Sequence, residues 1–208
     1  MINESDYDSR WAAEWKLLYA VIVAGKSAKF ADRVMVRLID DSDPDGYPFD
    51  QIRAMILGSD LDNRLRRARS GNYRKFAKCF PKLVKLDAET CSIEELEAIH
   101  GIGGKTSRFF LLWTRPDARY AALDTHVMKF LNRLGHTKSR QTPPAGTKTY
   151  QKLETIFLAI ASRMGVSARE LDYSVWLSYS QGAEEELFQN LEAEYNLKEL
   201  RHGALQVL

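Results

Sequence analysis

Apolar side chains recur at helical spacing along most of this chain. Trp11, Trp15, Leu18 and Ile22 follow one another at intervals of three or four residues, and similar stripes recur further on. A stripe with this period lies on one face of an α-helix, where it can be buried. Runs in which several β-branched residues alternate with polar ones, as half-buried strands require, do not occur. The sequence therefore predicts an all-α fold, and it contains no internal repeat.

Composition narrows the class of protein further. Apolar residues make up 45% of the 208 positions and charged residues 28%, which is ordinary for one globular domain or for two small lobes that share a core. Cys79 and Cys91 are too few for a disulfide framework or a four-thiolate metal site. No apolar run approaches the roughly 18 residues of a membrane span, and residues 1–10 are too polar and acidic for a signal peptide. We expect a cytoplasmic monomer with no membrane association.

Charge is unevenly distributed although the net charge is only +2. Nine basic and no acidic side chains lie between Arg64 and Lys85, whereas acidic residues concentrate in 40–50 and 184–199. Such segregation suits a protein that turns one face towards a polyanion. The alternative for the basic run is an ordinary solvated helix face, and the sequence leaves both interpretations open.

Glycine, proline and capping residues predict where several helices begin and end. We expect loops at Asp40–Asp50 and Thr137–Thr149, both broken by proline and glycine. Ser92 and Glu95 form a capping-box pattern that opens a short helix, and Asp124 with Thr125 caps another that Gly135 closes. Two further helices, at about 150–164 and 168–180, precede an acidic C-terminal helix or tail.

The glycine-rich stretch Gly101–Gly104 predicts a tight hairpin between two helices. Glycine permits a positive φ and a close approach of two backbones. The N–H groups that begin the second helix can receive a phosphate oxygen, and Lys105 and Thr106 lie in its first turn. Gly104-Lys105-Thr106 also matches the end of a nucleotide-binding P-loop. That motif requires glycine where Ile99 stands, and no strand precedes it, so the sequence favours a phosphate-binding hairpin.

Two motifs together carry a family resemblance. The segments IHGIGGKT (99–106) and LDTHV (123–127) place the aspartate nineteen positions after the lysine. In these motifs and their spacing the chain resembles the helix-hairpin-helix DNA glycosylases of the endonuclease III superfamily. A weaker resemblance extends from about Trp15 to about Glu185, and His100 replaces the proline that is usual in the family.

The resemblance assigns catalytic roles to Lys105 and Asp124. Lys105 matches the lysine that attacks the deoxyribose, displaces the base and forms a Schiff base, which then promotes strand cleavage by β-elimination. Attack requires a neutral amine, and the positive end of a helix together with basic surroundings favours loss of the proton. Asp124 would stabilise positive charge on the sugar as the glycosidic bond breaks. His126 is expected either to contact the substrate or Asp124, or to pack between helices.

The same resemblance implies contacts with double-stranded DNA that carries a damaged or modified base. Backbone amides of the hairpin would hold phosphates, often beside a monovalent cation on the hairpin carbonyls. Lys26 and Asn72-Tyr73 occupy the positions from which family members fill the space left by an extruded nucleotide, although both depart from the usual residues. The expected DNA-binding residues are Gly101, Gly103, Gly104, Thr106, Lys26, Asn72, Tyr73 and Arg74.

The family fold implies two lobes with the active site in the cleft between them. Residues 27–135 would form a barrel-like helical lobe that carries the hairpin at about 92–113, and residues 1–26 with 136–208 the second lobe. We expect no iron–sulfur cluster, because no cysteine follows Cys91. Two alternatives stay open: a monofunctional glycosylase in which Asp124 activates water, and a non-catalytic DNA-binding module. The excised base is also open between an oxidised pyrimidine, an oxidised purine and a bulky modified cytosine.

Overall fold

The fold is known from a computed structural model, which describes residues 8–39, 46–139, 143–144, 146–195 and 200. These residues form eleven helices and no strand, so the predicted all-α class is confirmed for the part of the chain described. None of the helices in this part combines the length with the apolar character that crossing a bilayer requires.

The chain forms two compact units, residues 1–110 and residues 111–208. The division falls inside helix α7 (Gly104–Thr114), between Phe110 and Leu111. This cut differs from the predicted lobe boundaries, since α1 packs against α2 and α3 within the first unit. The predicted association of residues 1–26 with 136–208 concerns contacts between the units and stays a prediction.

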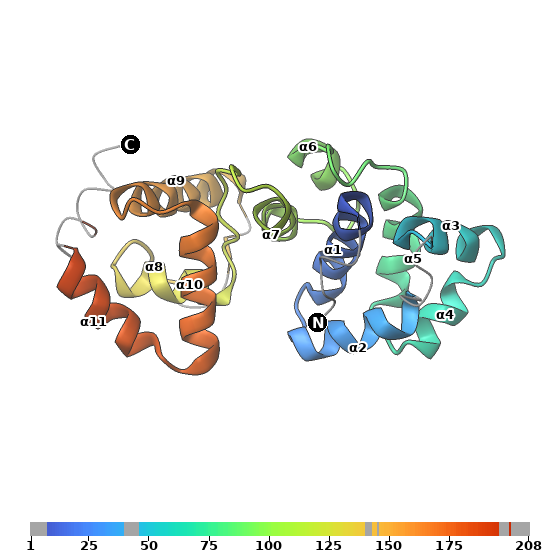
Figure 1. The fold of residues 1–208 in the computed structure, drawn as a ribbon, viewed down its shortest axis with the longest axis horizontal. Coiled ribbons are helices and arrows are strands. Elements are labelled where there is room, and N and C mark those ends of the chain that lie inside the picture. The colour runs from blue at the N-terminus through green and yellow to red at the C-terminus, as the bar shows by residue number, and fades with distance from the viewer. Residues whose placement is uncertain (1–7, 40–45, 140–142, 145, 196–199, 201–208) are drawn as a thin grey trace. The chain divides into compact units, whose positions relative to one another are not determined.

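The first unit contains six helices before α7. In chain order they are α1 (Ser9–Val23), α2 (Ala28–Leu38), α3 (Pro48–Leu57), α4 (Leu61–Arg67), α5 (Tyr73–Leu83) and α6 (Ile93–Glu97). Helix α1 contacts α2 and α3, and α4 lies against α3 and α5 (Figure 1). The apolar faces of these helices meet in a core that includes the fully buried rings of Phe49, Phe76 and Phe80.

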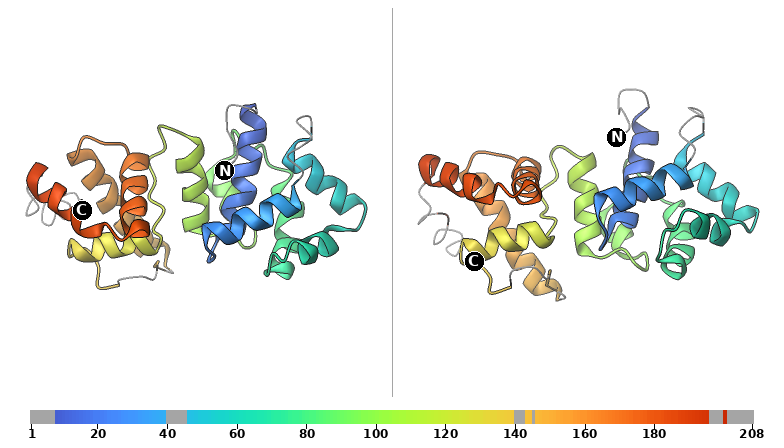
Figure 2. Two further views of the ribbon diagram at one scale, coloured as in Figure 1. Left: turned by 60° about the horizontal axis from the view of Figure 1, so that its bottom comes forward. Right: turned by 90° about the horizontal axis from the view of Figure 1, so that it is seen from below.

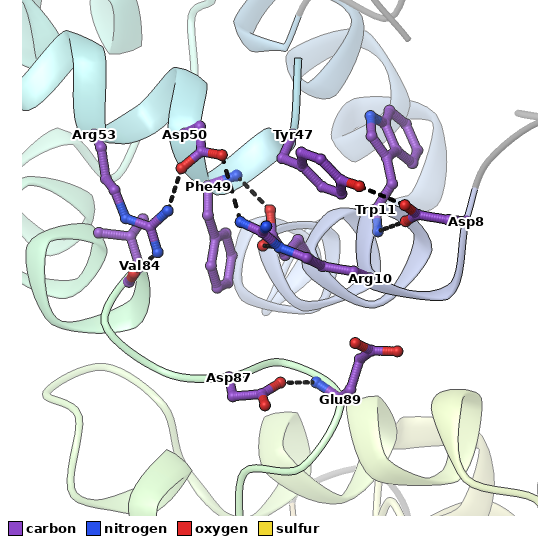
Figure 3. A network of polar contacts seen from close by, with 11 residues as sticks. Asp8, Arg10, Trp11, Tyr47, Phe49, Asp50, Arg53, Val84, Asp87 and Glu89 are labelled. Atoms are coloured by element: carbon purple, nitrogen blue, oxygen red, sulfur yellow. Dashed lines mark hydrogen bonds and ion pairs between the residues drawn. The ribbon is translucent and has the colours of Figure 1, made fainter. Parts of the chain in front are cut away.

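Polar contacts fix the start of α1 to the start of α3 (Figure 3). Asp8 caps α1 by accepting the backbone N–H of Trp11 at 2.8 Å, and its other oxygen accepts the hydroxyl of Tyr47. These two hydrogen bonds lower the pKa of the Asp8 carboxyl, and the one from Trp11 has the larger effect. The buried carboxylate of Glu14 accepts the backbone N–H of Phe49 at 2.8 Å. Residues more than thirty positions apart are thereby tied together.

Both predicted loops are shorter than expected. Pro48 is the first residue of α3, where its missing N–H costs nothing and its fixed φ suits a helix, so the helix begins inside the predicted Asp40–Asp50 loop. Residues 40–45 of that loop lie outside the described part of the chain. Likewise α9 begins at Thr147 instead of after Thr149. The prediction was wrong for these residues because proline and polar residues are tolerated in a first helical turn.

The second unit packs four helices around one apolar core. They are α8 (Thr125–Arg133), α9 (Thr147–Arg163), α10 (Ala168–Gln181) and α11 (Glu184–Glu194), and α10 contacts the other three (Figure 2). The ring of Phe130 lies edge-on to that of Phe157 and tilted against that of Phe188, with centroids 6.4 and 5.8 Å away. The predicted helices at 150–164 and 168–180 are confirmed.

Candidate functional site: a glycine hairpin and two flanking loops

The predicted hairpin joins α6 to α7. Ser92 caps α6 through the expected capping box: its hydroxyl accepts the backbone N–H of Glu95 at 3.2 Å, and the Glu95 carboxylate accepts that of Ser92 at 2.7 Å. After α6 ends, the N–H of Ile102 bonds the carbonyl of Ile99 at 3.0 Å and closes a turn. Helix α7 then starts at Gly104.

The start of α7 leaves backbone amides without an acceptor inside the helix. The carbonyl of Gly103 accepts the N–H groups of Thr106 and Ser107 at 2.8 and 3.1 Å. The N–H groups of Gly103 and Gly104 precede these and therefore have no acceptor inside the helix. An anion placed here would receive two amides at the positive end of an 11-residue helix. Thr106 itself is buried and its amide is engaged within the hairpin, so its predicted phosphate contact stays a prediction.

Two glycines of the hairpin, Gly101 and Gly103, differ in whether their backbone and surroundings require glycine. Gly101 has a φ of +96°, which side chains rarely adopt, and a Cβ added there would lie 2.7 Å from Cε of Lys75 on α5. Gly103 has no positive φ, and no atom lies within 4 Å of the position that its Cβ would take. The same role was predicted for both positions, whereas of these two the structure requires glycine only at Gly101.

A side-chain brace that the sequence analysis missed holds the two helices of the hairpin together. One oxygen of the Glu97 carboxylate accepts both the Ser107 hydroxyl, at 2.9 Å, and the Arg108 guanidinium, at 2.6 Å. Arg108 is buried and also bonds the carbonyl of Gly104. The sequence contained one indication of this contact. An acidic residue in the last turn of a helix interacts unfavourably with the helix dipole, so a nearby cation is expected to compensate its charge.

Lys105 lies in the first turn of α7, as predicted. Its side chain is half-buried, and Nζ lies 4.7 Å from the ring centroid of Phe109, one turn further along the helix. The negative face of the ring attracts the ammonium form of the side chain. In the structure this amine therefore lies against the ring of Phe109.

Asp124 is the N-cap of α8, as predicted. Its Oδ1 accepts the backbone N–H groups of His126 and Val127 at 2.8 and 2.9 Å, which fixes the plane of the carboxylate. Within the described part of the chain, Oδ2 receives no hydrogen bond, so it is available for a second role. Lys105 belongs to the first unit and Asp124 to the second, and their predicted convergence on one substrate stays a prediction.

His126 packs against α10. Its ring centroid lies 6.0 Å from that of Tyr179 at a tilt of 36°, which agrees with the helix-packing alternative. The ring atom Nδ1 is buried and has no hydrogen-bond partner among the described residues. A buried polar atom without a partner costs stability. A substrate contact stays a prediction.

The two loops predicted to enter the DNA lie next to each other. Lys26, between α1 and α2, places Nζ 5.4 Å from the ring centroid of Phe30. A Cβ added to Gly71, between α4 and α5, would lie 3.9 Å from the tip of that ring and 4.0 Å from Nζ of Lys26. Phe30, which the sequence analysis did not single out, therefore joins the two loops.

The turn before α5 has an unusual backbone. Arg69 and Gly71 have φ values of +54° and +81°, and the hydroxyl of Ser70 between them is buried without a partner among the described residues. Asn72 is exposed and makes no capping hydrogen bond, while the Tyr73 ring lies 5.0 Å from the guanidinium of Arg66. Arg74 follows, exposed, in the first turn of α5. The predicted DNA-binding residues Asn72, Tyr73 and Arg74 thus follow one another at the start of α5.

Acidic neighbours neutralise part of the basic run. Arg64 pairs with Asp60 at 2.9 Å and Arg66 with Asp62 at 2.7 Å, so α4 fits the alternative of an ordinary solvated helix. Helix α5 differs, because none of its cations takes part in an ion pair within the described residues. Those cations are Arg74, Lys75, Lys78 and Lys82.

Neither a group of metal ligands among the described residues nor a comparison with known proteins helps to identify the site. Among the residues that the structure describes, no three histidine, cysteine or acidic side chains lie together in a way that could hold a metal ion. Comparison of the chain with protein-family models, with curated proteins and with solved structures found no match.

Proposed function

We propose that this chain is a bifunctional DNA glycosylase of the helix-hairpin-helix kind, which removes a damaged or modified base and then cleaves the strand. One observation carries the proposal. The glycine turn leaves the N–H groups of Gly103 and Gly104 without an acceptor in the helix whose first turn bears Lys105. Two amides that can bind a phosphate and an amine that can act as a nucleophile thus belong to consecutive residues, as an attack on the sugar of a held nucleotide requires.

Binding begins with the phosphate backbone in this proposal. The hairpin amides hold phosphates and set the register of the protein on the duplex without reading bases. The reacting nucleotide leaves the stack, because chemistry on its sugar is blocked inside the duplex. The adjoining loops of Lys26 and of Asn72-Tyr73 then occupy the space that the nucleotide vacates, supported by Phe30.

Lys105 performs the covalent chemistry. Its neutral amine attacks C1′ of the deoxyribose, and the bond between C1′ and the base breaks with its electrons and a proton going to the base. Opening of the sugar ring gives a protonated Schiff base between C1′ and Nζ. Loss of a proton from C2′ then expels the phosphate at C3′, because the iminium accepts the electrons. In the structure Nζ lies over the ring of Phe109, so it must leave that ring before it reacts.

Asp124 stabilises the positive charge that develops on the sugar as the base departs. The two backbone amides on Oδ1 orient the carboxylate, and Oδ2 is the atom that would face the sugar. In the monofunctional alternative the same oxygen orients a water molecule that replaces Lys105 as the nucleophile. A monovalent cation on the hairpin carbonyls also stays a prediction; of those carbonyls, Ile99 and Gly103 already accept backbone N–H groups.

Borohydride trapping tests the proposal directly. The wild-type protein, incubated with a duplex that contains one abasic site, is expected to form a covalent adduct on reduction. Lys105→Ala should form none, whereas Lys152→Ala, which removes an exposed lysine of α9, should form as much as wild type.

The remaining outcomes separate the alternatives. Release of a base without any adduct from the wild type would establish the monofunctional reaction. Binding of DNA with neither adduct nor base release would establish a non-catalytic module. Duplexes that each bear one modified base would identify which base is removed.

A further inference from the structure

A lysine from another helix, Lys75 of α5, lies against the glycine turn of the hairpin. The ideal Cβ position on Gly101 lies 2.7, 3.0 and 3.3 Å from Cε, Cγ and Cδ of Lys75. The aliphatic stem of this lysine therefore lies directly across the glycine, in space that any other residue at position 101 would occupy. Lys75 comes from α5, and the two residues are 26 positions apart in the chain.

The position of Lys75 on α5 explains why its stem is partly buried. At 100° per residue, the buried side chains of this helix span one arc and the cations span the opposite one. The buried side chains are Phe76, Cys79, Phe80 and Leu83, and the cations are Arg74, Lys75, Lys78 and Lys82. Lys75 lies at the border between the two arcs, a position from which a lysine can pack its apolar stem against a neighbour and keep its charge in water. Here the stem packs against Gly101.

The charge of Lys75 also lies close to Gly101 in the glycine turn. One C–N bond of about 1.5 Å separates Nζ from Cε, so the ammonium lies within about 4 Å of the Cβ position on Gly101. No ion pair in the described part of the chain involves this ammonium. A lysine that is fixed along its stem loses less conformational entropy on binding an anion than a fully mobile one does.

We infer that Lys75 is a DNA-backbone contact of the hairpin, which binds the same phosphate as the glycine amides or the one next to it. This inference rests on the proposed function in so far as that function makes DNA the ligand. It adds to the site a residue from a different helix, and it gives Gly101 a second purpose, which is to admit the lysine stem.

The test compares Lys75→Met with wild type and with Lys152→Met. Methionine keeps an unbranched apolar stem against Gly101 and removes only the charge, so thermal unfolding should stay unchanged. Binding is measured on a duplex with a tetrahydrofuran residue in place of one nucleotide, across a series of salt concentrations. Lys75→Met should weaken binding and lower the slope of log affinity against log salt by about one. Lys152→Met, which also removes one exposed charge, should leave that slope unchanged.

A second measurement identifies the phosphate. Duplexes that carry one neutral methylphosphonate at successive positions should weaken wild-type binding most at one phosphate near the tetrahydrofuran. At that position the methylphosphonate should weaken binding of Lys75→Met much less, because the contact is already absent, while Lys152→Met should respond like wild type.

The outcomes are distinguishable. An unchanged salt slope for Lys75→Met, with salt-dependent binding by the wild type, would overturn this inference and leave the proposed function standing. Equal slope changes in both methionine variants would also overturn it, because the loss of any exposed positive charge would then change the slope, whatever its position. A wild-type protein that binds DNA but forms no borohydride adduct would contradict the proposed lyase and leave Lys75 as a DNA contact. A wild-type protein that binds no duplex would refute both.

Discussion

Glu97 and Ser107 meet across the glycine turn, where the Ser107 hydroxyl donates to the Glu97 carboxylate at 2.9 Å. Arg108 donates to the same oxygen from the next position of α7. The angle between α6 and α7 is therefore set by side chains as well as by the glycines. The direction of the amides of Gly103 and Gly104 depends on this brace, because they begin the helix that it holds.

Removing the Glu97 carboxylate should destabilise the first unit. In Glu97→Ala the buried Arg108 and Ser107 both lose an acceptor, and the free energy of unfolding should fall by about 1–3 kcal/mol. Urea denaturation followed by circular dichroism measures this. Glu94→Ala is the matched control, since Glu94 is exposed on the same helix, and it should change stability by less than about 0.5 kcal/mol. Equal losses in the two variants would show that the brace is energetically unimportant.

The two glycines that flank Ile102 should respond differently to alanine. Gly101→Ala forces a side chain into a left-handed backbone conformation and against the Lys75 stem, so it should cost about 1–2 kcal/mol or more. Gly103→Ala meets neither obstacle and should cost less than about 1 kcal/mol. Chemical denaturation of both variants gives the comparison. A larger loss for Gly103→Ala would contradict the hairpin geometry.

Substitutions at Asp124 should separate its capping role from its proposed chemistry. Asparagine caps a helix about as well as aspartate, so Asp124→Asn should keep the stability of the wild type, while Asp124→Ala should lose about 1 kcal/mol. Both variants lose the negative charge and should release modified bases far more slowly than wild type. Thermal unfolding and a base-excision assay measure the two effects.

The Asp124→Asn variant also tests the division of labour with Lys105. Because Lys105 forms the Schiff base in the proposed reaction, this variant should still be trapped on a duplex with a preformed abasic site. Full base release by a stable Asp124→Asn protein would leave Asp124 with the capping role alone.

The thiol of Cys79 should be nearly inert at neutral pH. Burial raises its pKa to about 11, an effect that the nearby charge of Lys75 partly offsets. Alkylation in a Cys91→Ala background should therefore be very slow at pH 8 and accelerate as pH rises towards 11, because the thiolate is the reactive form. The folded pKa lies above the unfolded value of 9.0, so this group should cost stability as pH rises from 9 through 11. Rapid alkylation of the folded protein at pH 8 would contradict the burial.

Sequence patterns predicted the elements that depend on neighbouring residues. The caps at Ser92 and Asp124 were predicted correctly, because a side chain there bonds amides only two or three positions further on. The all-α class followed from the period of apolar residues. The ends of the loops were predicted less well, as Pro48 shows, because a proline is compatible both with a loop and with a first helical turn.

The sequence by itself determined that a glycine turn would precede a helix with Lys105 in its first turn and that Asp124 would cap another. Only the tertiary structure decided that Lys75 lies across Gly101, that Glu97 binds Arg108, and that Phe30 joins the loops of Lys26 and Gly71. The local features arise from hydrogen bonds within one helical turn, which a short stretch of sequence specifies. The others arise where apolar helix faces pack together, and the residues that this packing brings into contact share no local pattern.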